Sequence, residues 1–270
     1  MQFFELMSIS HRYMEILNPV TSEKIIQLGK ILKLKKGSRV IDFGCGCAEP
    51  LTLWAENFGI TGIGIDISED FCNRAKDKLV KRGLSDQIKI VCSPAADYVF
   101  EEGAFDAATC IGATFAFGGF QQTIQAMKRA VNENGCLGIG ETYWLSNQVP
   151  PDYAQKQTTT YTEAELAQFA RNEGFELEYI IRASRDDWDR YISDNWVGLL
   201  RWLEENPNHP DYEQVLQHFR ADQDDYLQFQ SQYMGWALYC LSLMKSHPSP
   251  PSQDSPTSSD QLSNQVTPRF

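Results

Sequence analysis

Basic residues are scarce in this 270-residue chain, which has 24 Lys and Arg against 36 Asp and Glu and a net charge of −12. A nucleic-acid-binding protein needs a basic face that displaces counterions from phosphate, so no nucleic-acid partner is expected. No apolar run approaches the roughly 20 residues that span a bilayer, so no membrane partner is expected either. The opening residues, MQFFELMSIS, lack the positive and apolar regions of a secretory signal, which predicts a cytoplasmic protein.

A cysteine pattern that would fit a disulfide framework or a metal site is also missing. The seven cysteines are odd in number and irregularly spaced, which is typical of reduced thiols. Cys45 and Cys47 have no second pair at zinc spacing, so no bound metal is expected. What the chain does have is 42% hydrophobic and 12% aromatic residues, which is enough for a substantial core.

Strand-like apolar runs alternate with helical stretches along most of the chain. Helices are expected between the strands and, ahead of the first one, over residues 2–17 and 22–34. Strands joined through helices form mostly parallel sheets covered on both faces. We therefore predict an α/β, Rossmann-like fold with a mostly parallel sheet of seven strands, at residues 38–43, 60–65, 87–92, 105–111, 135–140, 176–181 and 235–243.

The spacing of the last two strands predicts an insertion. Residues 183–234 hold eleven acidic and four basic residues, with aromatic residues at helical spacings, and they predict a helical cap over the sheet edge. Residues 246–270 contain seven Ser and five Pro and predict a disordered tail. The predicted division is therefore N-terminal helices at 1–37, a sheet core at 38–182, the cap at 183–234, the last core strand at 235–245 and the tail at 246–270.

A glycine-rich turn after the first strand carries the most informative functional signal. Residues 40–50 read VIDFGCGCAEP, and Gly44 and Gly46 let the backbone turn sharply and approach a ligand. The carboxyl ends of parallel strands form the crevice in which such sheets bind ligands. The second strand ends in Asp66, twenty residues after Gly46, where a carboxylate can accept hydrogen bonds from ribose hydroxyls.

Two classes of nucleotide cofactor share this arrangement. Dinucleotide enzymes seat a pyrophosphate beside a third glycine, but that position is Glu49 here, and a carboxylate would repel a pyrophosphate. Asp42, two residues before Gly44, suits instead a ligand with a cationic amino-acid end and no phosphate. A nicotinamide-dependent oxidoreductase is therefore the less favoured interpretation.

The pair of motifs VIDFGCG and GIGIDIS resembles motif I and the acidic loop of class I S-adenosylmethionine (SAM)-dependent methyltransferases. The resemblance covers about residues 20–182, and Asn18-Pro19, Gly112-Ala-Thr and Gly140-Glu-Thr-Tyr-Trp extend it to a bacterial subfamily of small methyltransferases. It implies SAM as the cofactor.

The resemblance also implies roles for individual residues. Pro94 stands where the family usually has an acid that bonds adenine, which leaves the Ala95 N–H as the expected contact. Ile111 begins a loop whose small residues let the backbone approach the sulfonium. The methionine part of SAM would be lined by Gly44, Cys45 and Gly46 and oriented by Asp42, with Asp66 on the ribose and Ile67 on the adenine.

The methyl acceptor is expected beside the ends of the fourth and fifth strands and under the cap. Glu141, in the segment after the fifth strand, is a candidate base or cation anchor, and the alternative is a solvated loop acid. Trp188 and Tyr191 share one helix face, where they either hold a cationic amine or seal the cap. Further candidates are Tyr143 and His11 for catalysis and Trp144 and Phe115 for acceptor binding.

These observations predict a SAM-dependent methyltransferase that transfers a methyl group to a small-molecule acceptor by in-line displacement. The leaving group is a neutral thioether, so positioning of the acceptor can supply much of the acceleration. The main alternative is a non-catalytic SAM-binding or partner-binding module in the same fold, with the acidic cap as its interaction face. The acceptor, the type of atom methylated and the oligomeric state stay open.

Overall fold

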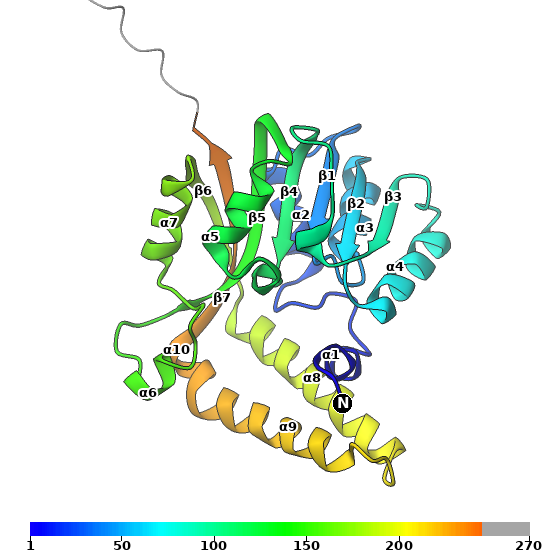
Figure 1. The fold of residues 1–270 in the computed structure, drawn as a ribbon, viewed down its shortest axis with the longest axis vertical. Coiled ribbons are helices and arrows are strands. Elements are labelled where there is room, and N and C mark those ends of the chain that lie inside the picture. Colours follow the sequence, from blue (N-terminus) through cyan, green and yellow to red (C-terminus); the bar gives the residue numbers. More distant parts are fainter. Residues whose placement is uncertain (245–270) are drawn as a thin grey trace, which may run out of the picture.

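The computed structural model describes residues 1–244, and its centre is one seven-stranded sheet (Figure 1). The strand order is β3-β2-β1-β4-β5-β7-β6, with β7 antiparallel to both of its neighbours and the other pairs parallel. This confirms the predicted fold class; the predicted tail lies outside the described residues. The strands are β1 (Arg39–Phe43), β2 (Thr61–Asp66), β3 (Ile88–Cys92), β4 (Phe105–Ile111), β5 (Val131–Trp144), β6 (Phe175–Arg182) and β7 (Met234–Leu243).

Two apolar layers cover the sheet because alternate strand residues point to opposite faces. Val40 joins one core with residues of α2 (Ser22–Ile31), α3 (Glu49–Phe58) and α4 (Glu69–Arg82). Ile41 joins the other core with residues of α5 (Phe120–Met127) and α7 (Glu163–Asn172). The short elements η1 (Ala95–Asp97), η2 (Thr114–Phe117) and α6 (Pro151–Ala154) lie in the connections between strands and helices.

The predicted helical insertion between the last two strands is present. It consists of α8 (Arg185–Glu205), α9 (Tyr212–Asp225), η3 (Tyr226–Gln230) and α10 (Ser231–Tyr233), and its long helices lie below the sheet in Figure 1. Apolar residues of α1 (Phe3–Ser10) pack on Leu199 and Leu203 of α8. The N-terminus and the cap thus form one layer under the sheet edge.

Several predicted elements have different bounds in the structure; the helix predicted over residues 22–34, for example, ends at Ile31. Two of the differences matter for the site. The first helix ends at Ser10 rather than residue 17, and turns follow it. The fifth strand runs to Trp144 rather than ending at residue 140, because β7 pairs with it from Cys136 opposite Ser242 to Trp144 opposite Met234. Glu141 and its neighbours are therefore strand residues and not part of a following loop.

Candidate active site

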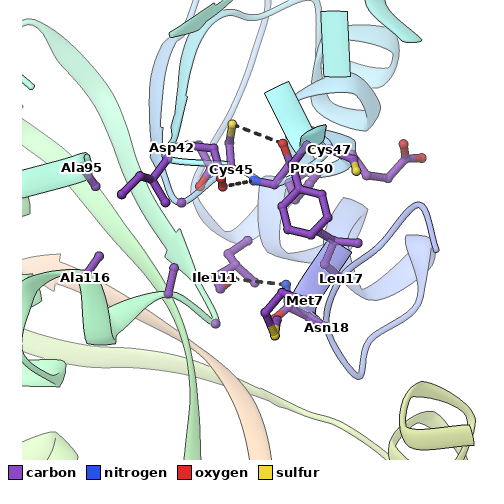
Figure 2. A pocket seen from close by; sticks show the side chains of 18 of the residues that line it. Met7, Leu17, Asn18, Asp42, Cys45, Cys47, Pro50, Ala95, Ile111 and Ala116 are labelled. Atoms are coloured by element: carbon purple, nitrogen blue, oxygen red, sulfur yellow. Dashed lines mark hydrogen bonds between the residues drawn. The ribbon is translucent and has the colours of Figure 1, made fainter. Parts of the chain in front are cut away.

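A cavity of about 270 Å³ lies at the carboxyl ends of β1, β2 and β4. Residues 1–19, here called the N-terminal segment, cover it from below. Figure 2 shows Met7, Leu17 and Asn18 of this segment on one side of the cavity and Asp42 and Ala95 on the other. The Asn18 side-chain amide donates a hydrogen bond to the Ile111 carbonyl oxygen at 3.1 Å, which ties the segment to the end of β4.

The glycine-rich turn forms the upper wall of this cavity. Gly44 and Gly46 have φ values of 72° and 53°, in the left-handed region that favours glycine. The N–H groups of Gly44 and Cys45 donate to the Ile65 carbonyl oxygen at 2.8 and 2.9 Å, so the turn is held against β2. A Cβ atom on Gly44 would overlap that of Ala113. The turn therefore brings bare backbone close to both the cavity and the loop after β4.

Asp66 closes β2 and faces the same cavity. Its Oδ2 accepts the Gly46 N–H at 2.7 Å and its Oδ1 accepts the Ser68 N–H at 2.9 Å. Burial raises the pKa of Asp66, although both hydrogen bonds favour its ionised form. Each carboxylate oxygen has a second lone pair, so Asp66 can also accept hydrogen bonds from a ligand in the cavity.

Asp42 lies deeper, at the end of β1, and is 1% exposed. Its Oδ1 accepts a hydrogen bond from the Thr109 hydroxyl at 2.7 Å. Burial raises the pKa of Asp42 to about 7, against the effect of Thr109 and with a smaller contribution from the nearby Asp66 carboxylate. A positively charged ligand group beside Asp42 would favour its ionised form.

The charged groups around the cavity are acidic. Glu15 and Glu49 line it along with Asp42 and Asp66, and the ammonium of Lys78 bridges Glu15 and Glu49, at 2.5 Å from Glu49. Within residues 1–244, no Lys, Arg or His side chain lines this cavity. Like charges repel, so the arrangement suits a ligand of net positive charge and disfavours a pyrophosphate.

An apolar slot continues from Asp66 toward β3. Ile67, directly after Asp66, is 46% exposed, and Ala95 begins η1 after the neighbouring strand. The Asp97 N–H donates to the Pro94 carbonyl oxygen at 3.1 Å and closes this short turn. Pro94 lines the cavity without offering a carboxylate. Apolar side chains and the backbone of η1 thus form the walls of this slot.

Comparisons with known proteins agree with this geometry. Residues 40–135 match the family described as "Methyltransferase domain". The chain is 32% identical to the Escherichia coli protein YjhP over 241 residues, which are 87% of this chain and 97% of that protein. It is also 32% identical to a SAM-dependent methyltransferase from Geobacter sulfurreducens, crystallised with S-adenosyl-L-homocysteine (SAH), with a TM-score of 0.82 over 89% of this chain and 98% of the other. The chain belongs to the SAM-dependent methyltransferases.

A third relative is more distant. The 27-O-demethylrifamycin SV methyltransferase of Amycolatopsis mediterranei is 23% identical over 215 residues, 77% of this chain and 75% of that protein. The cofactor of the present chain is SAM. Its net positive charge and its ribose suit a cavity lined by acids and bare glycine backbone. The predicted cofactor residues and one predicted acceptor residue all line this cavity: Asp42, Gly44, Cys45, Gly46, Asp66, Ile67, Ala95, Ile111 and Phe115.

Glu141 lies beside the cavity rather than in its lining. The Thr114 hydroxyl at the start of η2 donates to one carboxylate oxygen, and the Thr142 N–H donates to the other at 2.7 Å. Burial raises the pKa of Glu141 in spite of these hydrogen bonds. Thr114 directly follows the cavity-lining Ala113, so Glu141 contacts the cavity through that loop.

Three of the aromatic candidates, Tyr143, Trp144 and Trp188, do not line the cavity. Tyr143 is buried against Gly235 on the neighbouring strand, and Trp144 packs edge-on to Tyr153 with ring centres 6.2 Å apart. Trp188 is buried in the core on the α2 face of the sheet. These tryptophans and Tyr143 lie outside the cavity lining.

His11 and Tyr191 contact each other instead of the cavity. His11 is 2% exposed, and its Nδ1 lies 3.0 Å from the Met7 carbonyl oxygen, which can only accept. Nδ1 also lies 2.8 Å from the Ser10 hydroxyl, and Nε2 forms a hydrogen bond with the Tyr191 hydroxyl at 3.0 Å. Burial lowers the pKa of His11 to about 4, so the ring is neutral near pH 7. This pair joins the N-terminal segment to α8.

Reasoning from sequence did not identify the N-terminal side chains that line the cavity. Phe3, Phe4, Met7 and Leu17 line it, but they show no strand or helix motif that ties them to the glycine-rich turn. Only Asn18 carried a signal, through the family resemblance.

Within residues 1–244, no helix combines the length and apolar character needed to cross a bilayer. In the same range, no group of three or more His, Cys, Asp or Glu is arranged to hold a metal ion.

Proposed function

We propose that this methyltransferase transfers the methyl group of SAM to a small-molecule acceptor. The observation that carries the proposal is the covered cavity: the N-terminal segment crosses the end of the sheet that binds the cofactor and leaves about 270 Å³. A macromolecular acceptor would need an open face at that position. The net charge of −12 also disfavours nucleic acid. The relative named for 27-O-demethylrifamycin SV acts, by its name, on a small molecule.

Each cofactor-binding residue has a role that its position supports. Asp42 would hold the ammonium of the methionine end, against which Gly44, Cys45 and Gly46 pack. Asp66 would accept the ribose hydroxyls while it keeps its own bonds to the turn. The adenine would lie between Ile67 and Ala95, with Ile111 near the sulfonium.

Methyl transfer from SAM depends more on the positioning of the acceptor than on acid–base catalysis. When bound, SAM supplies a methyl group activated by a sulfonium. The protein's task is to hold the acceptor in line and to exclude water, which can supply several kcal/mol. Glu141 would position the η2 loop through Thr114. It acts as a base only for an acceptor that must lose a proton.

Incubating the full chain with methyl-labelled SAM and a metabolite extract tests the proposal. We expect label in a compound of low molecular mass and, by isothermal titration, binding of both SAM and SAH. Label found only in protein or nucleic acid would refute a small-molecule acceptor. SAM binding without transfer across broad extracts would favour a non-catalytic binding module. All seven cysteines are free thiols, which supports the cytoplasm as the site of reaction.

A further inference from the structure

The cavity has a second half that the cofactor contacts do not use. One half is formed by the glycine-rich turn, Asp42, Asp66 and the slot beside Ile67. The other half is formed by α1 and η2, which contribute only apolar side chains: Phe3, Phe4, Met7, Phe115 and Ala116. Since the acceptor must meet the sulfonium between the ribose and the methionine ends, this second half is the space open to it.

Three phenylalanine side chains of this half of the cavity are exposed, although large apolar side chains are usually buried. Phe3, Phe4 and Phe115 are 60%, 37% and 58% exposed. Their rings nevertheless lie close together, with centres 5.2 Å apart for Phe3 and Phe4 and 6.4 Å apart for Phe3 and Phe115. Exposed apolar surface gathered at a cavity is typical of a ligand site. A ligand that covered these rings would gain binding free energy in proportion to the apolar surface that it buries.

No free charge is available to a ligand in this half. With SAM bound, Asp42 and Asp66 would face the cofactor in the first half of the cavity, and the ammonium of Lys78 is paired with Glu15 and Glu49. A cation would have to give up its hydration without a partner, which is costly. Trp188 and Tyr191 do not replace one, because they take the alternative role of sealing the cap: Trp188 is buried in the core and the Tyr191 hydroxyl is bound to His11.

We propose that the methyl acceptor is an uncharged, predominantly apolar molecule that binds between α1 and η2 against Phe3, Phe4 and Phe115. This proposal rests on the proposed function, because it takes the first half of the cavity to be filled by SAM. Met7 at the same wall is flexible and polarizable and adapts to an irregular apolar shape. The acceptor itself would then complete the exclusion of water from the sulfonium.

The test uses N-phenyl-1-naphthylamine, a neutral apolar dye that fluoresces when it leaves water, on protein saturated with SAH. We expect the dye to bind the SAH-loaded protein. In the double variant Phe3→Ser/Phe115→Ser, its affinity should fall about tenfold or more, since each lost ring contact is worth roughly 1 kcal/mol. The affinity for SAH should stay within about twofold, which also reports that the variant is folded. Val80→Ser is the control, because Val80 is 69% exposed on α4 and lies outside the cavity lining.

A second measurement uses the labelled extract. The methylated product should partition into ethyl acetate at neutral pH. The proposal is overturned if the dye does not bind SAH-loaded protein, if the double variant binds it as wild type does, or if the labelled product is a water-soluble ion. Should the double variant not fold, Phe115→Ser alone carries the comparison. Failure of SAH itself to bind would overturn the proposed function and is seen separately by titration.

Discussion

At the scale of single residues, Asp66 serves the fold and the proposed ligand with one carboxylate. Asp66→Ala would leave the N–H groups of Gly46 and Ser68 without their acceptor, at a cost of roughly 1–3 kcal/mol each. Asp66→Asn keeps one acceptor oxygen and so separates the two roles. We expect both variants to bind SAH about tenfold or more weakly and the alanine variant to melt lower. Isothermal titration measures the SAH affinity, and thermal unfolding measures the stability. An unchanged SAH affinity in Asp66→Asn would contradict the assignment of Asp66 to the ribose.

Asp42 predicts a pH dependence of cofactor binding. Burial raises its pKa to about 7, so in the free protein it becomes protonated as the pH falls through 7. Only the ionised carboxylate attracts the ammonium of SAH. The affinity should therefore be full above pH 7 and fall below it by up to about tenfold per pH unit. Asp42→Asn should bind weakly with little pH dependence between about pH 5.5 and pH 8. A flat wild-type profile would contradict the assigned contact.

Local sequence patterns predicted that the glycine-rich turn lines the cavity but not where most of the proposed acceptor residues lie. Gly44, Gly46 and Asp66 are set by short-range geometry: a tight turn after one strand and the end of the next. The surroundings of Trp188 and Tyr191 depend on which distant segment packs on α8. In the structure, that segment contains His11, whose ring is hydrogen-bonded to the Tyr191 hydroxyl. A spacing of three residues predicts a shared helix face but not what that face contacts.

At the scale of elements, some helix ends are specified by the local sequence, whereas the length of a strand can depend on a distant partner strand. The local sequence specifies both ends of the helix Glu69–Arg82, because Ser68 caps its start and Gly83 ends it in a left-handed conformation. The strand Val131–Trp144 is longer than expected. Its extension depends on antiparallel pairing with β7, whose residues are about a hundred positions away in the chain. Such pairing leaves no mark in the local sequence.

The packing of α1 on α8 gives a prediction about the cover of the cavity. Gly198 on α8 lies so close to α1 that a Cβ atom there would be 2.6 Å from the Ile9 carbonyl oxygen and would also overlap that of Ser10. Gly198→Ala should therefore push α1 away from the cap. We expect faster amide hydrogen exchange over residues 3–14 and weaker SAH binding, because residues of the N-terminal segment line the cavity.

The matched control for that experiment is Val197→Ala on the same helix, where the side chain is 46% exposed. It changes helix composition without touching α1 closely. Unchanged exchange and SAH affinity in Gly198→Ala would mean that the N-terminal segment does not depend on this contact. A loss of affinity in both variants would point to a general weakening of α8.

At the scale of the whole molecule, the acidic character of the chain and of its cavity favours binding of SAM or SAH over binding of a nicotinamide dinucleotide. A ligand that binds only the folded state stabilises it by about 2.7 kcal/mol at a hundredfold excess over its dissociation constant. For a domain of this size, SAH should then raise the unfolding temperature by roughly 5–10 °C. NADH should not raise the unfolding temperature, because it would bring a pyrophosphate into a cavity lined by four acids: Asp42, Asp66, Glu15 and Glu49. Thermal unfolding with each ligand at equal concentration measures the difference, and adenosine is the control for contacts that both share. A shift with NADH equal to that with SAH would contradict the electrostatic argument, since repulsion by these carboxylates is what distinguishes the two.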